Sequence, residues 1–287
     1  MKFPSHWSRA SAEGTDDEGT QVSFSCWRAS DESPDDAQES ALTAAKRIVQ
    51  KFLRGERLDR YGYGQLPMRE EVLGRFAGGD GELFAAVTRN ASGVMVLNAA
   101  RVMFIDLDFP PTSPGEEFRY FLAKLFRRSV PSPRSRREQE IRDRLERFLG
   151  ENPAWNVRLY RTCAGFRALV THDLFLPTAD STRETLNSLG CDPLYVRLCK
   201  TQDCFRARLT PKPWRCGYSS NTISWPRDET QQEQFDAWLS GYTQRQADRA
   251  TCRFVGELGS GRVHTEVERI IKLHDETTRC DEPLPLA

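Results

Sequence analysis

Hydrophobic residues recur with two different periods along the chain, and the two periods separate predicted helices from predicted strands. In ALTAAKRIVQKFLRG (41–55) apolar residues recur every three or four positions, which is typical of an amphipathic helix. In RVMFIDLDF (101–109) they alternate, which is typical of a strand with one buried face. The same analysis predicts strands at 84–89, 93–98, 156–162, 166–172, 194–201 and 204–210, and helices at 68–76, 116–128, 135–150 and 181–190.

From residue 101 onward, the predicted elements follow the order β-α-β-β-α-β, which indicates an α+β fold. This is the split βαβ order of ferredoxin-like and RRM-like antiparallel sheets, with N- and C-terminal helices expected to flank it. The 101–109 strand would then be central, and one face of the sheet would stay open for a ligand. We expect three regions: a disordered acidic tail at 1–39, a core at 40–217 and a helical C-terminal region at 218–287.

Charge is balanced overall, with 41 basic and 41 acidic residues, but it is unevenly distributed. Residues 1–40 hold nine acids against three bases and few large aliphatic residues, which favours a disordered tail. The bases of the whole chain are 34 Arg and 7 Lys. Arg binds phosphate with a two-pronged contact that Lys cannot make, although a codon bias would produce the same ratio.

No apolar run is long enough to cross a membrane, and the N-terminal segment lacks the apolar stretch of a secretory signal. We therefore expect a cytoplasmic protein that makes no membrane contact, and eight cysteines that stay reduced. Cys199, Cys204 and Cys216 are the closest group in sequence. They could bind zinc with Cys191 or His172 as a fourth ligand, but buried thiols are the favoured interpretation.

The most informative chemistry lies at the end of the 101–109 strand. Asp106 and Asp108 are two positions apart, so their side chains point to the same face, about 6–7 Å apart along the strand. Two carboxylates at this spacing can share Mg²⁺ or Mn²⁺ while phosphate oxygens complete the coordination shell. The hairpin at Gly165 and the neighbouring Arg167 should lie beside the acids, because the sheet is expected to be antiparallel.

Alternation on the other predicted strands places arginines and tyrosines on the same open face. Arg206 and Arg208 would lie there, together with Tyr160 and Tyr195. Cations and aromatic rings beside a pair of acids favour a metal-bound nucleotide or a nucleic-acid backbone as the ligand.

Three motifs in this order resemble those of the archaeo-eukaryotic primase superfamily. FIDLD (104–108) is similar to the family's first motif. TCAGFR (162–167) resembles its S-x-x-G-x-H hairpin, with Thr162 in place of Ser and Arg167 in place of His. The third motif is an acidic residue followed by a basic strand and a lysine, here Asp203, Arg206, Arg208 and Lys212.

The resemblance covers about residues 84–216 and implies an RRM-like core that joins nucleotides on DNA or another single-stranded nucleic acid. It implies Asp106 and Asp108 as ligands of the catalytic metals, with Asp203 as a third catalytic acid. It also implies a group of nucleotide- and phosphate-binding residues, namely Thr162, Gly165, Arg167, Arg206, Arg208 and Lys212. The segment 204–217 also resembles segments of bacterial proteins without an assigned function, and that likeness implies no activity.

Two other functions remain open from the sequence. A non-catalytic nucleotide- or nucleic-acid-binding module of RRM-like fold could use Tyr160 and Tyr195 to stack bases. An acid pair of this kind also occurs in glycosyltransferases, but there it usually follows a parallel strand, whereas the order predicted here is antiparallel.

Overall fold

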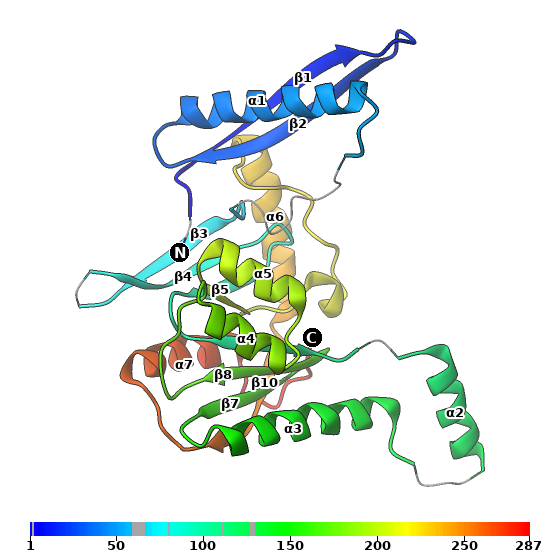
Figure 1. Ribbon diagram of the computed structural model, residues 1–287, viewed down its shortest axis with the longest axis vertical. Helices are drawn as coiled ribbons and strands as arrows, with labels where there is room; N and C mark the ends of the chain where they lie inside the picture. Colours follow the sequence, from blue (N-terminus) through cyan, green and yellow to red (C-terminus); the bar gives the residue numbers. More distant parts are fainter. Residues whose placement is uncertain (2, 59–66, 80, 111, 127–129) are drawn as a thin grey trace.

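The computed structural model describes residues 1–287 except 2, 59–66, 80, 111 and 127–129 (Figure 1). The described residues form a mixed α+β protein with antiparallel sheets, so the predicted fold class is confirmed at this level. Its strands are β1 (His6–Thr15), β2 (Gln21–Ser30), β3 (Glu71–Ala77), β4 (Leu83–Arg89), β5 (Met95–Ala99), β6 (Phe104–Asp108), β7 (Asn156–Thr162), β8 (Gly165–Val170), β9 (Phe205–Arg208) and β10 (Cys252–Gly259). Its α-helices are α1 (Pro34–Leu53), α2 (Pro114–Leu125), α3 (Pro133–Glu151), α4 (Asp180–Ser188), α5 (Pro193–Gln202), α6 (Glu229–Gln246) and α7 (Thr265–Thr278).

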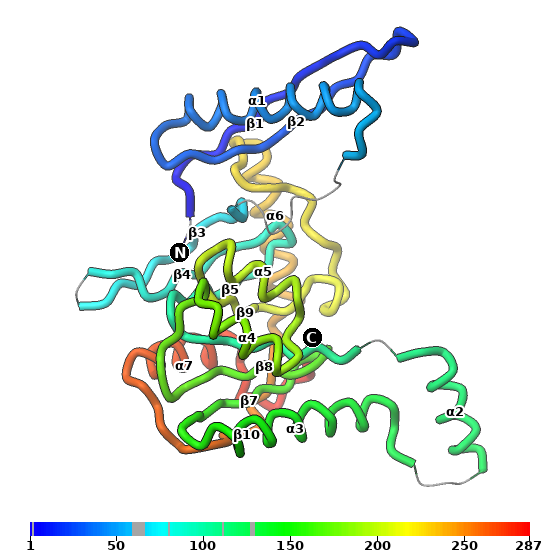
Figure 2. The backbone as a smooth tube through the Cα atoms, in the orientation of Figure 1, coloured from blue at the N-terminus to red at the C-terminus, as the bar shows by residue number. Residues whose placement is uncertain are grey.

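The N-terminal segment folds into a hairpin of β1 and β2 covered by α1 (Figure 2). Residues 1–39 are therefore not the disordered tail that their composition predicted. The buried residues of this unit are mostly small: Ala10 lies on the hairpin and Ala41 on the helix. A Cβ added at Gly14 would lie 2.6 Å from Val49 Cγ1, so the helix packs very close to the hairpin. Close packing of small side chains buries this interface without the large aliphatic residues that indicate a core in a sequence.

Two four-stranded sheets make up the rest of the core, with strand orders β3-β4-β5-β9 and β10-β7-β8-β6. The predicted split βαβ sheet is not formed, because β9 pairs with β5 in the first sheet and β6 is the edge strand of the second. The outer side of β6 is not bare. The Asp192 amide donates to Asp106 O at 3.3 Å, and the Tyr195 hydroxyl donates to Phe104 O at 2.9 Å.

Two predicted elements have the opposite type in the structure. The predicted strand at 194–201 is helix α5, which has Pro193 in its first turn and Asp192 as the N-terminal cap. Its buried residues Tyr195, Val196 and Cys199 have helical spacing. The predicted helix at 68–76 overlaps strand β3, which pairs with β4. The 116–128 helix ends as α2 at Leu125, and residues 127 and 128 lie outside the described residues.

Both faces of the second sheet are covered. On one face, Arg142 of α3 packs over the Phe166 ring at 5.0 Å. On the other, the ring of His274 from α7 lies 4.6 Å from that of Tyr160 and 5.5 Å from that of Phe104. The face predicted to be open for ligand is therefore closed by α7. The 218–287 region is not wholly helical, since it also contributes β10 to this sheet.

Candidate active site at the end of strand β6

Asp106 and Asp108 form the acid pair at the end of β6, where the strand leaves the covered part of the sheet. Asp106 is half-buried and Asp108 reaches the surface. In the ladder between β6 and β8, Asp106 lies opposite Arg167 and Asp108 lies opposite Gly165, as the sequence predicted. A Cβ at Gly165 would lie 2.1 Å from Leu107 O, so only glycine lets β8 approach the acid pair this closely.

Two cations, Arg208 and Lys212, lie near the acid pair, and a third, Arg215, lies near these two. Arg208 ends β9, Lys212 follows it, and Arg215 lies in the 3-10 helix Pro213–Cys216. Burial, together with the charges of Arg167 and Arg215, lowers the pKa of Arg208 to about 10. Burial, together with Arg208 and Arg215, also lowers the pKa of Lys212. The acid pair attracts both groups, but in each case this attraction does not offset burial and the neighbouring cations.

For the acid Asp108, burial and like charges also disfavour the charged form, so its pKa is raised and not lowered. Partial burial raises the pKa of Asp108, and the negative charges of Asp106 and Asp192 raise it further, against the attraction of Arg208 and Lys212. Asp192 caps α5 by accepting from the Leu194 amide at 2.8 Å. The sequence analysis missed Asp192 because it assigned the following residues to a strand. The Asp-Pro pair at 192–193 is the signal that could have shown a helix start there.

Arg167 is buried beneath this site and does not reach it as a free phosphate ligand. Its Nη1 donates to Arg208 O at 2.9 Å and lies 3.0 Å from His274 Nε2. Burial lowers the pKa of His274 to about 4, so the ring is neutral at pH 7. Its Nδ1 lies 2.8 Å from Asp275 Oδ1, so Nδ1 donates to the carboxylate and Nε2 accepts from Arg167. Arg167 therefore positions the end of β9 that carries Arg208.

Three other predicted site residues have different surroundings. Arg206 is buried and pairs with Glu70, at 2.7 and 2.9 Å to its two carboxylate oxygens. Asp203 accepts from the N-terminal amine of Met1 at 3.2 Å, at the opposite end of β9 from Arg208. Thr162 is buried on β7, two strands away from β6 in the sheet. Of the predicted set, the structure brings together the acid pair, Gly165, Arg167, Arg208 and Lys212.

A cavity of about 510 Å³ opens beside the acid pair. Asp108, Phe109 and Asp192 line one part of it, and Ile141 and Arg144 of α3 line another. It combines apolar walls with charged groups, which is the composition of a small-molecule site. Asp108 of the acid pair is thus accessible to a ligand of nucleotide size from this side.

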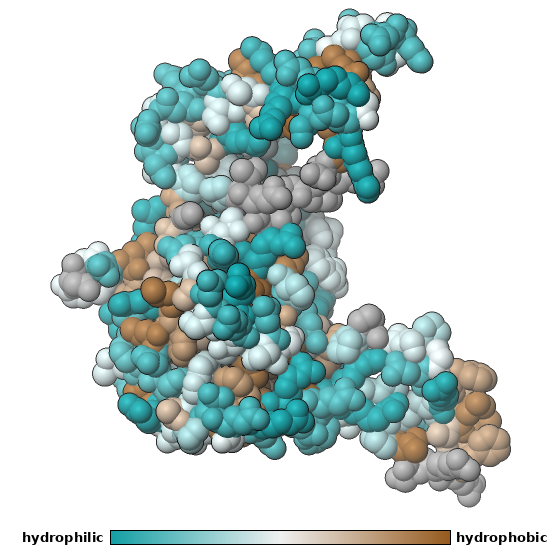
Figure 3. Space-filling model, in the orientation of Figure 1, coloured by the Kyte–Doolittle hydropathy of each residue, from teal (hydrophilic) through white to brown (hydrophobic). Residues whose placement is uncertain are grey.

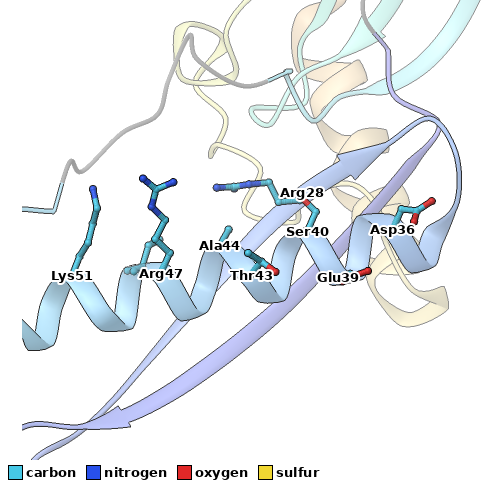
Figure 4. Close-up of a pocket in the computed structure, with 9 residues that line it drawn as sticks. Arg28, Asp36, Glu39, Ser40, Thr43, Ala44, Arg47 and Lys51 are labelled. Atoms are coloured by element: carbon cyan, nitrogen blue, oxygen red, sulfur yellow. The ribbon is translucent and has the colours of Figure 1, made fainter.

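A larger cavity, of about 730 Å³, lies along α1, far in sequence from the predicted site residues (Figure 4). Arg47 and Lys51 line it toward the C-terminal end of α1, while Asp36 and Glu39 lie toward the N-terminal end. This separation of charge is the one that a helix dipole favours, so it has a structural explanation.

Within the described residues, Cys199, Cys204 and Cys216 do not belong to a group of three ligand atoms close enough to share a metal ion. All eight cysteines are free, and Cys199, Cys204 and Cys216 are buried. Among the described residues, the one group of three metal-ligating side chains whose ligand atoms lie within 4.8 Å of one another is Asp275, Cys280 and Asp281. Asp275 there already accepts from Arg158 and Tyr160, which explains its position without an ion.

The acid pair is outside that group, so it offers a cation two carboxylates and not a closed cage. Mg²⁺ is commonly bound in this way, through one or two carboxylates and the oxygens of a substrate phosphate. The donor set therefore fits a cation that arrives with its phosphate ligand. Separately, no helix in the described part of the chain is long and apolar enough to span a membrane.

Comparisons with known proteins leave the site to be interpreted from its own geometry: no family model, no curated protein and no solved structure matches this chain.

Proposed function

We propose that the chain is a metal-dependent nucleotidyltransferase that acts on a nucleoside triphosphate and a single-stranded nucleic acid. In this proposal Asp106 and Asp108 hold Mg²⁺ or Mn²⁺. Arg208 and Lys212 bind the triphosphate. Arg167 holds Arg208 in place by donating a hydrogen bond to the main-chain carbonyl of Arg208.

The observation that carries the proposal is that the acid pair lies near Arg208 and Lys212 at one end of β6, where burial disfavours the charged forms of Asp108, Arg208 and Lys212. The pKa of Asp108 is raised by burial and by its acidic neighbours. Burial, Arg167 and Arg215 lower the pKa of Arg208, and burial, Arg208 and Arg215 lower the pKa of Lys212. A divalent cation beside the acids would favour their charged form, and a polyphosphate beside the bases would favour theirs.

These residues fit a transfer of a nucleotidyl group. A metal ion in such a site stabilises the negative charge on the attacking hydroxyl and on the leaving pyrophosphate. Arg208 and Lys212 would neutralise charge on the phosphates during this step. The cavity beside Asp108, with Phe109 and Ile141 in its walls, would hold the nucleoside.

The binding-module alternative is less well supported. It needs Tyr160 and Tyr195 exposed for base stacking, but Tyr160 is 0% and Tyr195 is 8% exposed. The likeness to primases is also narrower than the sequence suggested. It rests on the acid pair facing Gly165, while the sheet order, Asp203 and Arg206 do not support it.

The experiment is a pyrophosphate-release assay with ATP or a dNTP mixture, single-stranded DNA and Mn²⁺. We expect Asp108→Asn to reduce the rate about 100-fold or more, since mutation of groups that stabilise transition-state charge has effects of this order. Asp203→Asn is the matched control, because it removes a carboxylate that contacts the N-terminal amine outside the site. A wild-type rate equal to that of Asp108→Asn, or a rate unchanged by removal of the metal, would refute the enzyme proposal.

A further inference from the structure

Helix α2 extends away from the body of the protein as an arm (Figure 1). It has no buried residue along its length. The helix is nevertheless well defined at its start, where Ser113 and Glu116 form a reciprocal capping box and Pro114 occupies the first turn. Arg137 of α3 binds Glu116 at 2.7 Å and ties the base of the arm to the body.

One side of this arm is a stripe of large apolar residues. Phe118 and Phe121 are each 61% exposed, and Leu125 is 65% exposed. Phe126, just past the helix, is 71% exposed. Figure 3 shows apolar surface gathered at the far end of the arm. These side chains expose roughly 500 Å² of apolar area, which is large for a surface without a partner.

Two charged residues flank the stripe. Glu117 and Lys124 are seven residues apart, about two helical turns, so they lie on the same side of the stripe. Both are exposed, and neither makes an ion pair with another residue in the described ranges. The arm therefore presents an apolar stripe with Glu117 beside one end of it and Lys124 beside the other.

We propose that the arm pairs with the same arm of a second copy of this chain, with the two helices antiparallel. In an antiparallel pair centred near Phe121, the stripes face each other. Glu117 of each copy then meets the other copy's Lys124, so two ion pairs form across one two-fold axis. The antiparallel arrangement also places opposite ends of the helix dipoles side by side.

The area is sufficient for a weak, specific dimer. Two arms would bury on the order of 1,000 Å² in total, near the lower limit of specific protein interfaces. Helix α2 carries two acids, Glu116 and Glu117, and two bases, Arg119 and Lys124, so it has no net charge that would draw it to an anionic lipid surface. This inference is independent of the proposed nucleotidyl transfer.

Sedimentation velocity of the full chain, from about 1 to about 100 μM, tests the proposal, because a contact of this size is expected to dissociate within that range. We expect a concentration-dependent shift from monomer to dimer that Phe121→Asp abolishes. Leu176→Asp is the matched control. Leu176 is also 60% exposed, but it lies outside the arm, so its replacement should leave the shift unchanged.

Charge exchange tests the antiparallel register. Glu117→Lys or Lys124→Glu alone should weaken association about tenfold, because like charges then face each other. The double variant should restore association to within about threefold of wild type, since the pairs re-form with exchanged signs. A wild-type chain that stays monomeric to ~100 μM would overturn the proposal. It would also be overturned by a monomer that floats with phosphatidylserine vesicles, or by a dimer that survives Phe121→Asp.

Discussion

The two arginines of strand β9 should differ strongly in their contribution to stability, although they are only two residues apart. Arg206 is buried against Glu70, and the Asn98 side-chain oxygen accepts a further bond from it at 2.7 Å. Glu70 also accepts from the Thr88 hydroxyl at 2.6 Å. Removing one partner of a buried ion pair leaves an uncompensated charge and typically costs ~3–5 kcal/mol. Glu70→Ala should therefore lower the unfolding free energy by about that amount.

The assay is urea unfolding at neutral pH followed by circular dichroism. Glu70→Leu with Arg206→Met removes both charges, so the pair of changes should destabilise the protein less than the sum of the two single changes. Arg208→Ala should change the unfolding free energy by less than ~1 kcal/mol, because Arg208 is already disfavoured by neighbouring cations. A loss below ~1 kcal/mol for Glu70→Ala would refute the assignment of Arg206 to the core.

Two further predictions concern the support of the acid pair. Gly165→Ala would place its Cβ 2.8 Å from Asp108 Cα, so we expect a loss of ~1–3 kcal/mol in urea unfolding and weaker Mn²⁺–ATP binding in calorimetric titration; unchanged values would contradict the close approach of the strands. His274 has a folded pKa of about 4, below its usual 6.5, so the unfolded chain binds the extra proton between these values. The unfolding free energy should therefore be highest above pH 6.5, and it should fall by up to about 3 kcal/mol as the pH is lowered toward 4. Unfolding at a series of pH values should show this slope, and His274→Gln should remove most of it.

The parts of the fold that the sequence predicted correctly are those in which a local pattern and the tertiary environment agree. The alternation in 101–109 placed the acid pair on one side of its strand. The predicted antiparallel hairpin placed Gly165 beside the acid pair, where it lies opposite Asp108. The prediction of a strand at 194–201, where the structure has helix α5, was wrong. Five of these eight residues are apolar or aromatic, and such a run fits a buried strand and a buried helix equally well. The Asp-Pro start at 192–193 would have decided between them.

Other features of the site depend on contacts distant in sequence. The closure of the sheet by α7 joins residues that are far apart in the chain, so Tyr160 could be assigned to the correct side of β7 and still be buried. Arg206 and Arg208 are two residues apart, so strand alternation assigns both to the same face. Only the ion pair with Glu70 makes Arg206 part of the core and leaves Arg208 in the site. Asp192 reaches the acid pair through the turn before α5, which a one-dimensional pattern does not specify.

Calorimetric titration of the full chain with ATP, in the presence and absence of Mn²⁺, tests the central claim most directly. The claim is that the acid pair and the bases around Arg208 form one site for a metal-bound triphosphate. We expect binding with Mn²⁺, little binding without it, and loss of the metal dependence in the double variant Asp106→Asn, Asp108→Asn, because the cation reverses the repulsion between carboxylates and phosphates. Arg208→Ala should weaken binding by ~1–3 kcal/mol. Binding that is the same with and without Mn²⁺, and unchanged in the double variant, would contradict the claim.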